Sequence, residues 1–282
     1  MQPKSALEDA LALMRDLRAR CDWDAAQTHE SLRPYLLEEA HEVDEAIRSG
    51  DDALLREELG DLLLQVLFHS VLAAERGAFG ADDVANTLVT KMRGRHPHLY
   101  GDGVKEPWER MKAGRRRSIV DGLPLELPAL HRAHRLQERA AGVGFDWPDV
   151  AGPLAKVAEE LAEVSEFVTA HPPRIASSGA SSGASSGAPI RDAAHDQLAA
   201  ELGDLLFSCV NLCRKAGVHA SLALDHANAK FARRFQSVEA LARERGLRVG
   251  EVSLAVLDGL WDEVKAGEAA GDRAAQSAPL GP

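Results

Sequence analysis

The chain has 282 residues and a formal net charge of −11, and 45% of its residues are hydrophobic but only 5% aromatic. The acidic balance argues against a surface that binds nucleic acid. The mixed charged and apolar residues of segment 1–20 predict neither a signal peptide nor a membrane anchor, and no apolar run is long enough to span a bilayer. Three cysteines, an odd and sparse set, predict reduced thiols and a cytoplasmic protein.

The order of the apolar residues predicts an all-α protein. Leu7, Leu11, Met14 and Leu17 recur at helical spacing, and Ala, Leu, Glu and Arg, which favour helices, are abundant throughout. Helices are expected in chain order at about 6–20, 35–49, 53–76, 82–92, 110–117, 129 onward, 159–169, 192–215, 221–245 and 254–265. Loops are expected at 21–24 and 97–107.

A pattern of four carboxylates occurs twice in these helices. In each copy a Glu-x-x-Glu pair is followed by a Glu-x-x-Asp pair, and residues three apart lie on the same face of a helix. The first copy consists of Glu39, Glu42, Glu58 and Asp61, and the second of Glu160, Glu163, Glu201 and Asp204. Two such helices packed together would gather four carboxylates in one place.

Four neighbouring carboxylates repel one another unless cations neutralise them. A site that offers only oxygen ligands suits a hard divalent ion, Mg²⁺ or else Mn²⁺, better than zinc or copper. The two copies therefore predict two metal sites.

Three further motifs accompany the carboxylates: Cys21-Asp22-Trp23-Asp24, Arg95-His96-Pro97-His98 and Gly144-Phe145-Asp146-Trp147. Together with the duplicated pairs they make the chain resemble the MazG family of nucleoside triphosphate pyrophosphohydrolases. The resemblance implies two tandem antiparallel helical-bundle domains that dimerise through their helices. It also implies magnesium-dependent hydrolysis of a nucleoside triphosphate to the monophosphate and pyrophosphate, by a metal-activated water attacking the α-phosphate.

The same resemblance assigns roles to individual residues. The eight carboxylates above match the metal ligands of the family. The residues matched to nucleotide and phosphate binding are Lys156, Lys230, Arg233, Arg234, Trp261 and Lys265. Because these cations all belong to the second copy, Glu160, Glu163, Glu201 and Asp204 are ranked as the main catalytic set.

The domains are expected at 1–120 and 129–267, joined by a linker at 121–128 that contains Pro and Gly. A repeated Ser-Ser-Gly-Ala tract predicts a disordered insertion at 172–190, and segment 268–282 reads as a flexible tail.

Two alternatives remain open. The chain could be a helical scaffold that binds nucleotides without turnover, or a di-iron protein, since Glu38-x-x-His41 fits the Glu-x-x-His signature. Trp23 and Trp147 are read as core residues or loop anchors, with base stacking as the minor option. Expected partners are a nucleoside triphosphate and a second copy of the chain, with no nucleic acid and no membrane.

Overall fold

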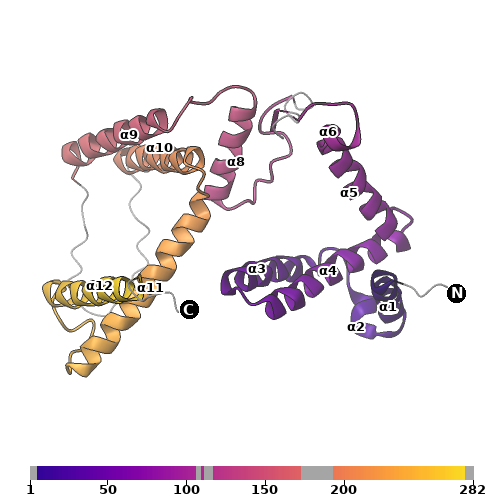
Figure 1. Cartoon of the computed structure of the whole chain (residues 1–282), viewed down its shortest axis with the longest axis horizontal. Coiled ribbons are helices and arrows are strands. Elements are labelled where there is room, and N and C mark those ends of the chain that lie inside the picture. Colours follow the sequence, from indigo (N-terminus) through magenta and orange to yellow (C-terminus); the bar gives the residue numbers. More distant parts are fainter. Residues whose placement is uncertain (1–4, 106–108, 111–116, 173–192, 277–282) are drawn as a thin grey trace. The chain divides into compact units, whose positions relative to one another are not determined.

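A computed structural model describes residues 5–105, 109–110, 117–172 and 193–276. All regular structure within these ranges is helical, which confirms the all-α prediction. The chain divides into two compact units between Glu106 and Pro107, earlier than the segment 121–128 expected to link the domains (Figure 1). Among the described residues, no helix has the length and apolar character needed to cross a bilayer.

The first unit contains a pair of long helices, α3 and α4; α1 and α5 contact α4, while α2 packs on α1 and α6 on α5 (Figure 1). Gly50, with φ 71°, ends α3, and the Asp51 side chain accepts hydrogen bonds from the first backbone amides of α4. This tight connection makes the two helices antiparallel. The helices are α1 (Ala6–Arg20), α2 (Asp22–Ala26), α3 (Arg33–Ser49), α4 (Asp52–Glu75), α5 (Ala81–Arg95) and α6 (Pro97–Tyr100).

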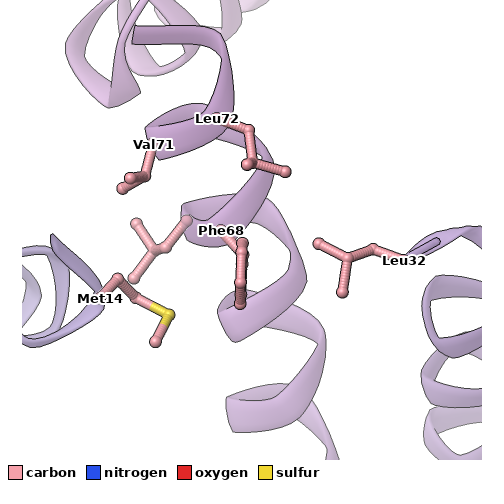
Figure 2. Packing of buried hydrophobic residues seen from close by; sticks show 6 residues of the cluster. Met14, Leu32, Phe68, Val71 and Leu72 are labelled. Carbon is pink, nitrogen blue, oxygen red and sulfur yellow. The ribbon is translucent and has the colours of Figure 1, made fainter. Parts of the chain in front are cut away.

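The core of the first unit lies around the C-terminal half of α4. Phe68, Val71 and Leu72 project from α4 between Met14 of α1 and Leu32, which precedes α3 (Figure 2). The N-terminal half of α4 carries the carboxylates and is open to solvent. The core thus holds one end of α4 and leaves the other end free to present charged side chains.

The second unit also contains a packed helix pair, α9 and α10, with α8 against α10 (Figure 1). Helices α11 and α12 pack on each other around Val238, Ala242 and Leu260, and α11 also contacts α8 and α10. The helices are α8 (Ala129–Gly142), α9 (Ala151–Ala170), α10 (Ala193–Lys215), α11 (Ala220–Glu244) and α12 (Leu254–Gln276).

Several local expectations were wrong. Residues 22–26 and 97–100 form the short helices α2 and α6 rather than loops, and α12 continues to Gln276, into the expected tail. Backbone hydrogen bonds of the i to i−4 type, such as Ala25 N–H to the Cys21 carbonyl, form these single turns. The predicted insertion at 172–190 and most of the predicted basic helix at 110–117 lie outside the described residues.

Candidate metal and nucleotide site

The first carboxylate cluster joins α3 to α4. Oxygens of Glu39, Glu58 and Asp61 lie within 4.8 Å of one another. The buried Gln65 donates a hydrogen bond from Nε2 to Glu39 Oε1 at 3.4 Å. Desolvation, followed by the negative charge of Asp61, raises the pKa of Glu39; desolvation and the charge of Glu42 raise that of Glu58. Among the described residues, no cation is a cause of either shift.

The second cluster joins α9 to α10 in the same way. Oxygens of Glu160, Glu201 and Asp204 lie within 4.8 Å of one another, and Glu160 is only 5% exposed. Lys156, one turn earlier on α9, places Nζ 2.7 Å from Glu160 Oε1 and 2.9 Å from Glu159 Oε1. Hydrogen bonds to Glu160 and Glu159 raise the pKa of the Lys156 ammonium above its ordinary value.

Within the described residues, the second cluster thus differs from the first in containing a cation, Lys156, and a more deeply buried glutamate, Glu160. Glu42 and Glu163 belong to neither set of converging oxygens, although their charges act on them. Desolvation, then the charge of Glu160, raises the pKa of Glu163, which remains at the edge of the second cluster.

Both clusters fit a hard divalent cation. Within the described residues they offer carboxylate oxygens alone, at close range, from rigid helices. The buried Glu160 carboxylate needs a positive partner, and in this structure it forms an ion pair with Lys156. Neither cluster includes Glu38 or His41, so the di-iron reading finds no support in this geometry.

A cavity of about 470 Å³ lies beside the second cluster. Lys156, Glu160 and Asp204 form its charged side, and aromatic and apolar side chains form much of the remaining wall. The residues of that wall are Ile119, Leu136, Gln137, Ala140, Phe145, Trp147, Phe207, Ser208, Asn211 and Arg214. An apolar wall beside charged groups is the usual composition of a small-molecule site.

The two tryptophans are not core residues, whereas their reading as loop anchors stays a prediction. Trp147 is 38% exposed and lines the cavity, so it is not a core residue. Trp23 is 53% exposed and makes an edge contact with Tyr35 at 6.2 Å between ring centroids. Both lie on short or irregular segments, where the sequence alone does not show which way a ring is directed.

The remaining expected phosphate-binding residues gather on α11 and α12, away from the wall of this cavity. Arg234 Nε lies 2.6 Å from Glu268 Oε2, and its guanidinium lies 6.0 Å from the Trp261 ring centroid. Arg233 also approaches Glu268, at 3.9 Å. The five residues Lys230, Arg233, Arg234, Trp261 and Lys265 are absent from the cavity lining.

Several cavity residues belong to no sequence motif. Gln137, Asn211 and Arg214 lie on α8 and α10, in helices whose spacing carried no site signal. The available clue was a single polar residue in an apolar stretch, as with Asn211 between Val210 and Leu212. Arg214 is held by Asp146 of the Gly-Phe-Asp-Trp motif, with Nη2 2.5 Å from Oδ1.

The model of the MazG nucleotide pyrophosphohydrolase domain matches residues 27–100 and 152–239, so each match contains one carboxylate set. A Thermotoga maritima protein named nucleoside triphosphate pyrophosphohydrolase/pyrophosphatase MazG is 42% identical over 271 residues, 93% of this chain and 96% of that protein.

Two further relatives carry the name nucleoside triphosphate pyrophosphohydrolase. One, from Escherichia coli, is 39% identical and covers 89% of this chain and 93% of its own length. Another, from Mycobacterium tuberculosis, is 42% identical over 56% of this chain and 50% of its own length. The chain belongs to the MazG family of nucleotide pyrophosphohydrolase domains.

Proposed function

We propose that the protein hydrolyses nucleoside triphosphates to the monophosphate and pyrophosphate, with Mg²⁺ or alternatively Mn²⁺ as cofactor. The observation that carries the proposal is the shared cavity of Lys156, Glu160 and Asp204 with an aromatic wall. A triphosphate needs positive charge, which Lys156 and a divalent ion held by the carboxylates would supply, and a base needs apolar surface, which the aromatic wall offers. The names of the relatives support the same activity.

Each group of residues has its own proposed role in binding the ion, the phosphates or the base. Glu160, Glu201 and Asp204 would hold the divalent ion, with Glu163 at the edge of the cluster. When bound, the ion would neutralise the phosphate oxygens and lower the pKa of a coordinated water. Lys156 can leave Glu160 for a phosphate oxygen once the ion takes its place, since a lysine is a mobile point charge. Trp147 and Phe145 can stack on a base.

We rank the second repeat as the catalytic one. Its cluster opens on the cavity and has Lys156, whereas the corresponding residue of the first repeat is Tyr35. The first cluster would then bind a metal in a contributing or structural role. The cations of α11 and α12 stay proposed phosphate-binding residues. Arg233 and Arg234 would have to exchange their ion pairs with Glu268 for phosphate to reach a bound triphosphate.

Dimerisation and cellular role complete the proposal. Large apolar side chains are exposed on α3 and α4, among them Leu37 at 62% and Ile47 at 60%, and a second copy of the chain is the partner we propose for them.

Three unpaired cysteines suit the reducing cytoplasm. There the reaction would remove non-canonical or excess nucleotides.

Product analysis tests the activity. The full chain is incubated with each nucleoside triphosphate and Mg²⁺, with EDTA as the control, and products are resolved by ion exchange. We expect the monophosphate and pyrophosphate in equal amounts, and no products with EDTA. Diphosphate plus orthophosphate would contradict the proposal, and binding without any product would identify the non-catalytic scaffold instead.

A further inference from the structure

Gln137 on α8 is a buried amide in the cavity wall, only 6% exposed. Its Nε2 donates a hydrogen bond to the backbone carbonyl of Phe207 at 2.8 Å. A carbonyl oxygen can only accept, so this contact determines which end of the amide is nitrogen. Its Oε1 is buried and has no hydrogen-bond partner among the described residues.

A buried acceptor without a donor is unfavourable, and native structures rarely retain one without a reason. The contact to Phe207 holds the amide between α8 and α10, so the oxygen cannot rotate to another partner without breaking it. Gln137 lines the cavity, so a molecule that enters it can supply the missing donor.

Asn211 on α10 is a second buried amide in the same wall, 8% exposed. Its Oδ1 accepts hydrogen bonds from Nε and Nη2 of Arg214 at 2.9 and 2.8 Å. Because a guanidinium only donates, this amide also has one orientation, and its Nδ2 group remains a donor. The cavity wall thus offers one oriented acceptor and one oriented donor among aromatic rings.

We propose that Gln137 determines base specificity by accepting a hydrogen bond at Oε1 from an N–H group on the edge of the nucleobase. The inference rests on the proposed function, since it takes the cavity to be the base-binding part of that site. Adenine presents such a donor in its 6-amino group, whereas unsubstituted purine has no N–H donor on its ring edge. A site built to pair with a donor rejects an analogue that lacks it, because the buried acceptor then stays unpaired.

The first test compares ATP with purine riboside 5′-triphosphate, which differs by the 6-amino group alone. For the unmodified full chain with Mg²⁺ we expect kcat/KM to be about tenfold higher for ATP. Equal values would overturn the proposal, because Oε1 would then be satisfied by other means, such as a bound water.

The second test replaces the amide. Gln137→Met keeps the length of the side chain and removes the acceptor, and Gln197→Met on the exposed face of α10 is the matched control. We expect the ratio of kcat/KM values to fall close to 1 in Gln137→Met and to stay near tenfold in the control. If Gln137 had a purely structural role, Gln137→Met would lower kcat/KM for both substrates by the same factor. The ratio of the two values would then stay unchanged, and that result would overturn the proposal.

A binding measurement separates this inference from the proposed activity. Calorimetric titration of the unmodified chain with AMP and with purine riboside 5′-monophosphate requires no turnover. About tenfold tighter binding of AMP supports the role of Gln137 even if the chain releases no pyrophosphate. Equal affinities, or no binding of either nucleotide, would contradict it whatever the activity measurements show.

Discussion

Lys156 illustrates how one side chain can stabilise a site before its metal arrives. Glu160 is buried, and the ammonium of Lys156 is the cation within ion-pair distance of it in the described part of the chain. Removing one member of such a pair leaves the other as an uncompensated buried charge. A divalent ion placed in the same cluster would replace that charge.

We therefore expect Lys156→Met to lower the melting temperature of the metal-free protein, because the buried Glu160 loses the cation that pairs with it. Adding Mg²⁺ should recover most of the loss. Thermal melts in EDTA and in Mg²⁺ measure both effects, with the exposed Lys91→Met as the control. A loss that is equal with and without Mg²⁺ would argue against the ion occupying this cluster.

At the scale of elements, one arginine ties three helices of the first unit together. Arg18 of α1 donates to the backbone carbonyls of Asp24, Ala25 and Gln27 and pairs with Glu75 of α4 at 2.8 Å. The hydrogen bond to Arg18 lowers the pKa of the Glu75 carboxyl. Through these contacts Arg18 links the C-terminal end of α2 to the C-terminal end of α4.

Arg18→Met should accordingly destabilise the protein by about 2–3 kcal/mol, because several carbonyls lose a charged donor. Arg20→Met, whose ion pair with Asp16 is exposed, should change stability by less than about 1 kcal/mol. Urea unfolding curves of the two variants provide the comparison. Equal effects would show that the backbone contacts of Arg18 contribute little.

Three histidines meet where α8 packs against the start of α11. The ring of His219 lies 5.2 Å from that of His131 and 4.5 Å from that of His134. Burial, then the neighbouring imidazole of His219, lowers the pKa of His131. Burial also lowers that of His134, although the charge of Glu138 acts in the opposite direction and that of Arg135 in the same one.

A lowered histidine pKa has a definite consequence for stability. Below the ordinary value of 6.5 the unfolded chain takes up protons that the folded cluster resists. The stabilisation is therefore complete above about pH 6.5 and declines as the pH falls towards the folded-state pKa values. Melting temperatures at pH 5.5 and 7.5 should differ less for His134→Gln than for the exposed control His226→Gln. If the melting temperatures at the two pH values differ equally in both variants, His134 is not the source of the pH dependence.

At the scale of the whole molecule, exposed apolar side chains favour association with a second copy of the chain. On α4, Leu59 is 48% exposed, Leu64 38% and Val66 42%, close to the first carboxylate cluster. In solution we expect the mass of a dimer, about twice the 30.3 kDa of one chain. Light scattering at micromolar protein checks this, and a monomer mass would contradict it.

The two repeats can be separated by a matched pair of variants. Glu163→Gln and Glu42→Gln remove the same charge at equivalent positions of the second and first clusters. If the second repeat is catalytic, the first variant should lower kcat about a hundredfold and the second less than threefold, comparable in scale with losing one group that stabilises developing charge. Circular dichroism confirms that both remain helical. The reverse order of effects would show that the first repeat is the catalytic one.

Local patterns in the sequence were sufficient to predict most helices and the three carboxylates that converge in each cluster, whereas Glu42 and Glu163, expected with them, lie outside the converging oxygens. The periodic apolar residues of α1 and the Gly50-Asp51 boundary before α4 act within a few residues, where spacing and capping determine the backbone. The pairs Glu58 with Asp61 and Glu201 with Asp204 also followed from helical spacing alone. Their convergence with Glu39 and Glu160 required only that neighbouring helices pack.

Tertiary structure alone decided the rest, because the remaining features depend on residues far apart in the chain. Phe145 and Trp147 line a cavity because the fold brings Gln137 of α8 and Phe207 and Asn211 of α10 into the same wall beside the second cluster. Arg234 and Trp261 were matched to a phosphate site, but their nearest partners, Glu268 and Phe231, were decided by the packing of α11 on α12. Spacing along one helix shows which residues share a face, whereas what that face meets depends on how the whole chain folds.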